Sequence, residues 1–461
     1  MAFVASSVAA LRRGWSPQLA CRERRPAVWA GRRGFGAAAA SASASSTSTS
    51  ASSSPSASPP PPSAEDSVSS ADAIRSLVRL SSRPRRAYVD ATSGVPVDAS
   101  TPGAVEVVTA DVELPVGPVR GLPGVSTDRR ATAYVLLRAD KWDARDLSAT
   151  RAVVFGHGFS QKPRNTQSTL RTLAAAGLAV IAPAVWLPDT APPWVSIATT
   201  RWWSSPPARL QTALAIDMLR AAELARGLGL TRLSLLGHSM GGALTLVIAD
   251  LLLAADREDQ KSDAGGDSGG GVGGVTLDAV VGLAPAAGPL QLTAVNPLLS
   301  LDAADGEERA IEFFRRWSPG GGDGGGASPP PPPAVFLVSA PRDRIVRPAS
   351  VAALFAAARE SGAIPRGAHV TLASGAHTGF EDSLQVNLRL LPLVDTLLFA
   401  ILDLLVYRLD VFELFTGDFD AQLRDTKALL VPWLTGDVVG DRSLYEDVPE
   451  GATIDSMYTP E

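Results

Sequence analysis

The chain has 461 residues, more than the roughly 250 that a large single α/β domain takes. Its formal net charge of −5 is small for this length, and the basic residues outside the leader form no run, so the composition disfavours nucleic acid as a partner. One cysteine, Cys21, and four histidines spread along the chain predict neither a disulfide framework nor a metal site, and nothing in the sequence implies a cofactor.

Residues 1–62 have the composition of a targeting leader. They carry a set of arginines against a single acid, Glu23, and end in a Ser/Ala/Pro-rich run. This pattern predicts a transit peptide for a plastid, with a mitochondrion as the alternative, followed by a disordered stretch. A disordered tail without a targeting role is the competing interpretation. We expect a spacer over 63–99, the folded domain over 100–437 and a C-terminal tail over 438–461.

Short apolar runs alternate with longer helical patterns along the folded part. This alternation predicts an α/β fold, a mostly parallel eight-stranded sheet with helices on both faces. The first two strands are joined without a helix, which predicts an antiparallel edge. Gly- and Pro-rich stretches at about 256–274 and 318–333 are interpreted as loop insertions. The predicted strands are 105–112, 131–137, 152–155, 178–182, 232–236, 277–283, 334–339 and 370–373.

The sequence GHSMG, residues 237–241, lies between a buried strand and a helical pattern. In that context G-x-S-x-G is the turn that exposes a serine nucleophile, here Ser239. The flanking glycines are needed because a Cβ on either side would collide within so sharp a turn. An ordinary structural turn is the alternative interpretation.

A serine nucleophile needs a base and an orienting carboxylate, in the chain order serine, acid, histidine. His377 follows the last predicted strand in a glycine-flanked loop and is the predicted base, whereas His369 lies within that strand and is expected to be packed. Asp343 follows another strand and is the predicted acid, with a helix-capping or Arg-paired role as the alternative. Asp278 precedes its strand and therefore falls at the wrong end of the sheet.

The oxyanion of an acyl-transfer intermediate needs two N–H donors. We expect one from Met240, directly after the serine, and one from Phe159 in the loop that follows the strand 152–155. His157 in the same loop is interpreted as bracing the loop.

These segments together resemble the α/β-hydrolase superfamily. Residues 105–434 are similar to the branch that holds chlorophyllases, dienelactone hydrolases and bacterial cutinases with polyester hydrolases, through the motifs "HGFSQKPRNTQSTLRTLAAAGLAVIAPAVW", "GHSMGGALTL" and "VVGLAPAAGP". The resemblance implies an α/β-hydrolase fold, a triad of Ser239, Asp343 and His377, and oxyanion donors at Phe159 and Met240.

Tryptophans cluster directly after the strand 178–182, where a loop would border the site. They are expected to form an apolar wall for a substrate, although some of them could instead fill the core of the loop itself. Residues 286–317 are the natural place for a cap. The cluster consists of Trp186, Trp194, Trp202 and Trp203.

The apolar stretch 388–415 is interrupted by Asp395 and Asp403, a pattern typical of a packed or interfacial helix. We therefore expect no membrane span, and peripheral membrane contact stays open.

The predicted activity is hydrolysis of a small or lipid-like carboxylic ester by two-step acyl transfer. Thioesters, phytyl esters and a non-catalytic binding role are the alternatives, and the sequence does not fix the oligomeric state.

Overall fold

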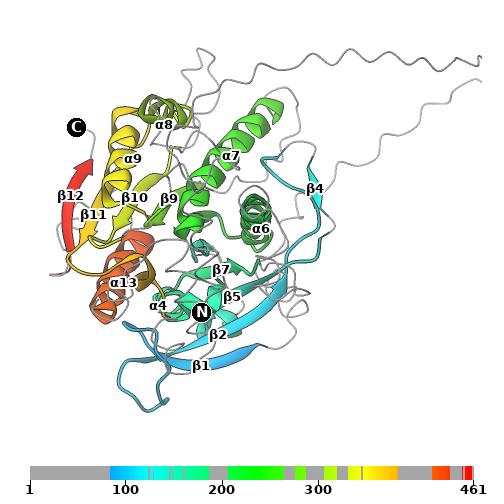
Figure 1. Ribbon diagram of the computed structural model, residues 1–461. Helices are drawn as coiled ribbons and strands as arrows, with labels where there is room; N and C mark the ends of the chain where they lie inside the picture. Colours follow the sequence, from blue (N-terminus) through cyan, green and yellow to red (C-terminus); the bar gives the residue numbers. More distant parts are fainter. Residues whose placement is uncertain are drawn as a thin grey trace, which may run out of the picture. The chain divides into compact units, whose positions relative to one another are not determined.

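A computed structural model describes much of the chain beyond residue 83, all of it within the unit Ser67–Glu461 (Figure 1). The leader 1–62, the apolar stretch 388–415 and most of the expected cap over 286–317 lie outside the described residues. Those residues are 84–122, 125–127, 129–144, 147, 149–158, 161–185, 206–263, 276–286, 306–318, 331–343, 346–382, 418–436, 449 and 452–458.

The main sheet has the strand order β1-β2-β5-β7-β6-β8-β9-β10-β11-β12. All pairs from β7 to β11 are parallel, while β1–β2, β2–β5, β5–β7 and β11–β12 are antiparallel. The predicted fold class, a mostly parallel sheet with an antiparallel N-terminal edge, is confirmed. The strands are β1 Arg85–Asp90, β2 Ala104–Glu113, β5 Thr132–Arg138, β6 Ala152–Gly156, β7 Ala179–Pro183, β8 Arg232–His238, β9 Thr276–Leu283, β10 Ala334–Ser339, β11 Gly367–Leu372 and β12 Ala452–Tyr458; β3 Gly117–Pro118 and β4 Ser126–Thr127 pair separately.

The sheet has ten strands where eight were predicted, because one strand was missed at each edge. The first, β1, lies in the stretch 63–99 that was interpreted as a spacer, and β12 lies in the stretch 438–461 that was interpreted as a tail. Each edge strand has a single neighbour and mixes polar with apolar residues, so neither carries the continuous apolar run of a strand buried on both faces.

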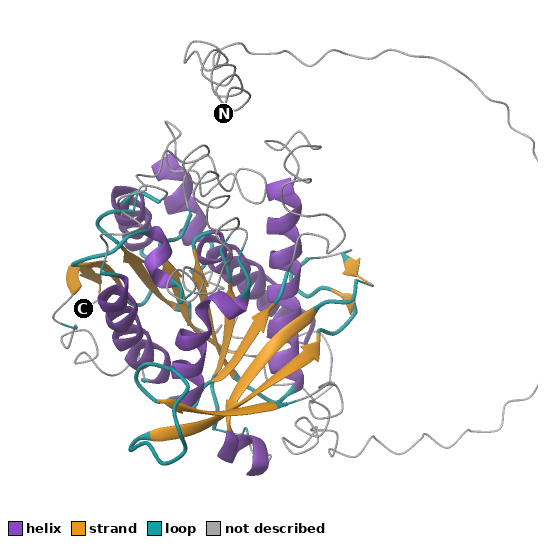
Figure 2. Ribbon diagram, turned by 60° about the horizontal axis from the view of Figure 1, so that its bottom comes forward, coloured by secondary structure: helices purple, strands orange, loops and turns teal. Residues whose placement is uncertain are grey.

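Helices lie on both faces of the sheet (Figure 2). On one face α4 contacts α13, and on the other α6 contacts α7. The helices are α3 Ala139–Ala144, α4 Gln167–Ala175, α6 Pro206–Gly227, α7 Met240–Asp263, α8 Gly306–Arg315, α9 Pro348–Glu360 and α13 Phe419–Thr435, with short 3₁₀ turns η2 Pro163–Thr166 and η4 His377–Phe380.

Helix α7 continues to Asp263, into the range 256–274 that was predicted as a loop insertion. The residues of this last part are polar, but Arg, Glu, Gln and Lys are good helix formers. Arg120 also pairs with Asp256 and, at 2.7 Å, with Asp259, which ties this end of α7 to the body of the domain. The first part of the predicted insertion, 256–263, is therefore helix.

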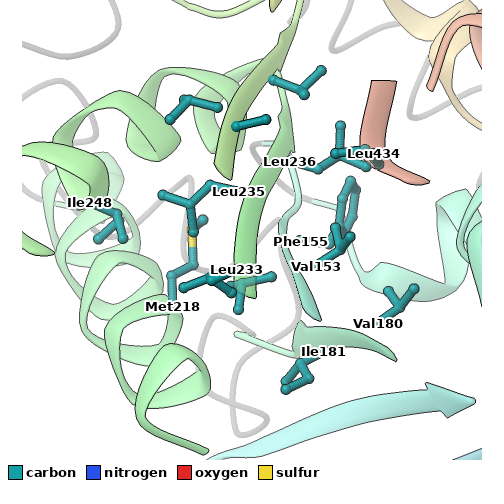
Figure 3. Packing of buried hydrophobic residues seen from close by; sticks show 14 of the residues in the cluster. Val153, Phe155, Val180, Ile181, Met218, Leu233, Leu235, Leu236, Ile248 and Leu434 are labelled. Atoms are coloured by element: carbon teal, nitrogen blue, oxygen red, sulfur yellow. The ribbon is translucent and has the colours of Figure 1, made fainter. Parts of the chain in front are cut away.

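The central strands separate two apolar layers (Figure 3). Leu235 of β8 points toward Met218 of α6 and Ile248 of α7, whereas its neighbour Leu236 points to the side of Leu434 of α13. All five side chains are buried to within 1%. This packing fixes β8 beside β6, with Gly237 paired to Gly156 at the carboxyl end of both strands.

Candidate active site

Ser239 lies between the last residue of β8, His238, and the first residue of α7, Met240. Its φ is 55°, in the left-handed region that a non-glycine residue rarely adopts. A Cβ on Gly237 would lie 2.3 Å from the carbonyl oxygen of Gly241, and a Cβ on Gly241 would lie 2.0 Å from the carbonyl oxygen of Gly156. The glycines are therefore required by close backbone contacts within the turn and between the turn and β6.

Three side chains from distant parts of the chain meet at this turn. The Nε2 atom of His377 lies 2.9 Å from Ser239 Oγ, and its Nδ1 atom lies 2.8 Å from Asp343 Oδ2. All three residues are buried, with exposed fractions of 7% for Ser239, 7% for His377 and 4% for Asp343. The arrangement can pass a proton from the hydroxyl to the imidazole and stabilise the imidazolium that results.

Asp343 lies in the loop between β10 and α9. Its second oxygen, Oδ1, accepts a hydrogen bond from the backbone N–H of Val346 at 2.7 Å. Both oxygens of the carboxylate are thus held, one by the backbone of its own loop and one by His377. Asp343 does not cap the following helix, since the N-cap residue of α9 is Arg347; its carboxylate instead closes its own loop and contacts His377.

His377 opens the turn η4, and Gln422 of α13 holds the backbone just before it. The Gln422 side chain accepts from Ala376 N at 3.0 Å and donates to Ala376 O at 2.9 Å, and it is fully buried. A Cβ on Gly375 or on Gly379 would lie 1.9 Å or 1.7 Å from Gln422 Oε1. The glycines that flank His377 therefore make room for this amide.

The other residues weighed for the site lie elsewhere. His369 is on β11, with Nε2 3.1 Å from Ser339 Oγ and Nδ1 3.2 Å from Asp455. Asp278 pairs with Arg232, at the end of β8 opposite Ser239. The structure thus brings His377 to the serine, and it packs His369 within the sheet.

The loop after β6 approaches the same place. His157 is buried, its Nδ1 lies 2.8 Å from the carbonyl oxygen of Gly158, and burial lowers its pKa from 6.5 to about 4. Its ring is therefore neutral and contacts the loop that it was expected to brace. Phe159 lies outside the described residues, and the second expected donor, Met240, is the first residue of α7.

A group of polar residues behind the serine was missed in the sequence. His238 is fully buried, its Nε2 lies 3.0 Å from the carbonyl oxygen of His377, and burial together with the nearby His377 lowers its pKa well below the ordinary value. Gln161 accepts from the N–H of Gly158 at 2.8 Å and donates to Glu381. A signal did exist in the sequence for His238 and Glu381, because each stands within four residues of a predicted triad member.

Among the described residues, no group of histidine, cysteine or acidic side chains is arranged to hold a metal ion. A search of the same residues finds no helix with the length and apolar character needed to cross a membrane. The four tryptophans expected to line the substrate site, Trp186, Trp194, Trp202 and Trp203, lie outside the described residues.

A strand, a strained serine at a sharp turn, a helix, and then an acid and a histidine in that chain order are the features of the α/β-hydrolase fold. This is the fold of the chain. No family model and no curated protein matches the sequence.

Solved structures with a similar arrangement include several hydrolases. A putative dienelactone hydrolase from Klebsiella pneumoniae subsp. pneumoniae is 15% identical, with a TM-score of 0.37 over 59% of this chain and 88% of that one. A dienelactone hydrolase-like promiscuous phosphotriesterase from metagenomic libraries is 14% identical, with a TM-score of 0.34 over 60% and 86%. Esterase B from Lactobacillus rhamnosis, in a structure with a tributyrin phosphonate, is 18% identical, with a TM-score of 0.32 over 57% and 73%.

Proposed function

We propose that this chain is a serine hydrolase that cleaves carboxylic esters of apolar substrates through an acyl-enzyme. The observation that carries the proposal is the hydrogen-bonded chain from Ser239 Oγ to His377 Nε2, at 2.9 Å, and from His377 Nδ1 to Asp343 Oδ2, at 2.8 Å. A buried serine with no base has little nucleophilic character, and this geometry supplies both the base and the group that orients it.

In the first step His377 takes the proton of Ser239 as the serine oxygen attacks the ester carbonyl. The tetrahedral oxyanion is held by the N–H groups of Met240 and Phe159, and the positive end of α7 adds to its stabilisation. His377 then gives its proton to the leaving alcohol. In the second step water, deprotonated by His377, attacks the acyl-enzyme. The bond between the acyl carbon and Ser239 Oγ then breaks, His377 returns the proton to Oγ, and the acid is released.

The substrate is proposed to be apolar because of the tryptophans between β7 and α6. Since β6, β7 and β8 are parallel, the carboxyl end of β7, which precedes these tryptophans in the sequence, lies at the same edge of the sheet as Ser239. A panel of p-nitrophenyl esters of graded acyl length, with a phytyl ester and an acyl-thioester, separates the activities implied by the resemblance to cutinases, dienelactone hydrolases and chlorophyllases. Turnover that does not rise with acyl length would contradict the apolar pocket.

The first test of the proposed function is covalent labelling with a fluorophosphonate probe. We expect labelling of the wild-type protein and none of Ser239→Ala, because only an activated serine attacks the phosphorus. The matched control is Ser234→Ala, a buried serine of β8 whose removal should leave labelling intact. Failure of the wild-type protein to label would mean that the hydrolase fold serves here only for binding.

We also propose that residues 1–62 direct the chain to a plastid, with a mitochondrion as the alternative. The support is their arginine-rich, acid-poor composition. A fluorescent protein fused behind these residues should collect in the organelle, and diffuse fluorescence would contradict targeting.

A further inference from the structure

The ring of His238 lies directly behind the proposed catalytic histidine. The centroids of the His238 and His377 rings are 4.8 Å apart, and Phe380 closes the other side at 5.5 Å. His238 Nε2 is 3.0 Å from the backbone carbonyl oxygen of His377. A carbonyl oxygen can only accept a hydrogen bond, so Nε2 of His238 must carry a proton.

The other ring nitrogen of His238, Nδ1, faces two oxygen atoms. It lies 3.3 Å from Gln161 Oε1 and 3.6 Å from Glu381 Oε1. The orientation of the Gln161 amide is fixed from both ends, because its Oε1 accepts from Gly158 N at 2.8 Å and its Nε2 donates to Glu381. Gln161 therefore offers Nδ1 an oxygen and no hydrogen.

Two protonation states of His238 are consistent with a proton on Nε2. If the ring is neutral, Nδ1 carries a lone pair and needs a hydrogen-bond donor. The Glu381 carboxyl group can be that donor only if it is protonated. If the ring is an imidazolium, its Nδ1–H donates to an ionised Glu381. Burial lowers the pKa of His238 and so favours the neutral ring. In both states one proton lies between Nδ1 and the Glu381 carboxyl group, and the two residues together have no net charge.

We propose that His238 and Glu381 share one proton and act as a positioning pair that holds the backbone of His377 through its carbonyl group. A proton between Nδ1 and Oε1 draws these two atoms together from the 3.6 Å that separates them. The inference rests on the proposed function, because the residue that the pair holds is the proposed base.

The zero net charge of the pair matters to the chemistry. A lone imidazolium 4.8 Å from the His377 ring would oppose the protonation of His377 in the transition state, and a lone carboxylate nearby would make His377 too basic to release its proton. The pair fixes the position of His377 without placing a net charge beside its ring. Through Gln161 it also reaches Gly158, so one chain of hydrogen bonds joins the histidine turn to the loop expected to hold the oxyanion.

The kinetic test compares Glu381→Gln with Glu381→Ala. Gln161 Nε2 and His238 Nδ1 face the same oxygen of Glu381, Oε1. The amide oxygen of Glu381→Gln would still accept from Gln161 but could not donate to His238, so kcat should fall by roughly tenfold or more. Glu381→Ala removes the carboxyl group that His238 and Gln161 both contact. Because a misplaced catalytic group can lower the rate by about 100-fold, kcat should fall by about that factor, while KM should stay within about threefold of wild type. The control is Asp455→Ala, which removes the carboxylate beside another buried histidine, His369, and should leave kcat unchanged.

Protonation is read directly by NMR of protein whose histidines are labelled with ¹⁵N, since the chain has four histidines to assign. We expect His238 Nε2 to carry a proton and its Nδ1 signal to move on Glu381→Ala, with no such movement on Asp455→Ala. An unprotonated Nε2, or a Glu381→Gln variant with the kcat of the wild-type protein, would overturn the proposal. If the wild-type protein shows no ester turnover the proposed function fails, whereas the NMR experiment still decides whether the pair shares a proton.

Discussion

Replacing Asp343 by asparagine tests the proton path, because the structure determines which way the new amide points. The backbone N–H of Val346 occupies Oδ1 at 2.7 Å and can only donate, so the amide oxygen must stay on that side. The NH₂ group then faces His377 Nδ1, where the carboxylate oxygen lies at 2.8 Å. His377 must accept at Nδ1 and carry its proton on Nε2, and in that tautomer it cannot take the proton of Ser239.

The size of the effect follows from the same distance. A carboxylate 2.8 Å from an imidazolium, with an effective dielectric constant of about 20, contributes about 6 kcal/mol of attraction. The Asp343 side chain is fully buried, so solvent screens this attraction little. Since about 1.4 kcal/mol is a factor of ten in rate, Asp343→Asn should lower kcat for a p-nitrophenyl ester by about 10⁴-fold. KM should change little, because the attraction develops mainly in the transition state.

The control is Asp455→Asn, the same substitution beside the other buried histidine, His369, at 3.2 Å. It should leave kcat within about twofold of wild type. Fluorophosphonate titration corrects both measurements for the fraction of correctly folded protein. A loss smaller than about tenfold in Asp343→Asn would refute the view that the carboxylate sets the tautomer.

Three further predictions concern the groups around the triad. Gln422→Ala leaves the partly buried N–H of Ala376 without its partner, while the C=O of Ala376 keeps only the N–H of Gly379 as a donor. It should lower the free energy of unfolding by about 2 kcal/mol and lower kcat more than it raises KM; an unchanged kcat would contradict the role of Gln422 in holding this turn. His157 has a pKa of about 4 in the folded protein and of 6.5 in the unfolded chain, so the unfolded chain binds a proton first as the pH falls. The free energy of unfolding should therefore decrease by about 3 kcal/mol between about pH 6.5 and about pH 4. Urea unfolding of His157→Gln should show a correspondingly smaller pH dependence. Gly241→Ala should lower the free energy of unfolding by more than about 2 kcal/mol and abolish turnover, because the added Cβ would collide with the Gly156 carbonyl. In the control, Gly227→Ala, the added Cβ meets no atom, so stability and turnover should not change.

The sequence predicted the interior of the sheet well because buried parallel strands are continuous apolar runs. The strand β10 Ala334–Ser339 was predicted with its observed bounds, and β8 was predicted to within two residues. Ser239 was found by a local pattern, since a G-x-S-x-G turn needs only a strand before it and a helix after it. Asp343 and His377 were found by their place after separate strands, and their catalytic roles stay a prediction that the experiments above test.

What the sequence did not reveal depends on contacts between distant residues. Gln422 stands on α13, and no pattern near it indicates that its amide pairs with the backbone of Ala376. The edge strands β1 and β12 mix polar with apolar residues in place of continuous apolar runs, because their outer edges pair with no strand among the described residues. Their pairing is set by backbone hydrogen bonds, which any sequence without proline can make, so composition alone carries little of the information.

The turn that carries His377 is held at three separate points. Asp343 binds the ring at Nδ1, Gln422 binds the preceding peptide group, and His238 binds the carbonyl of His377 itself. Only the first of these contacts changes the energy of the imidazolium directly, while the other two fix where the ring is. Substitutions at Asp343 should therefore change how activity depends on pH, whereas substitutions at Gln422, which has no charge, should lower activity by a similar factor at every pH. A pH–rate profile of each variant distinguishes the two kinds of contact.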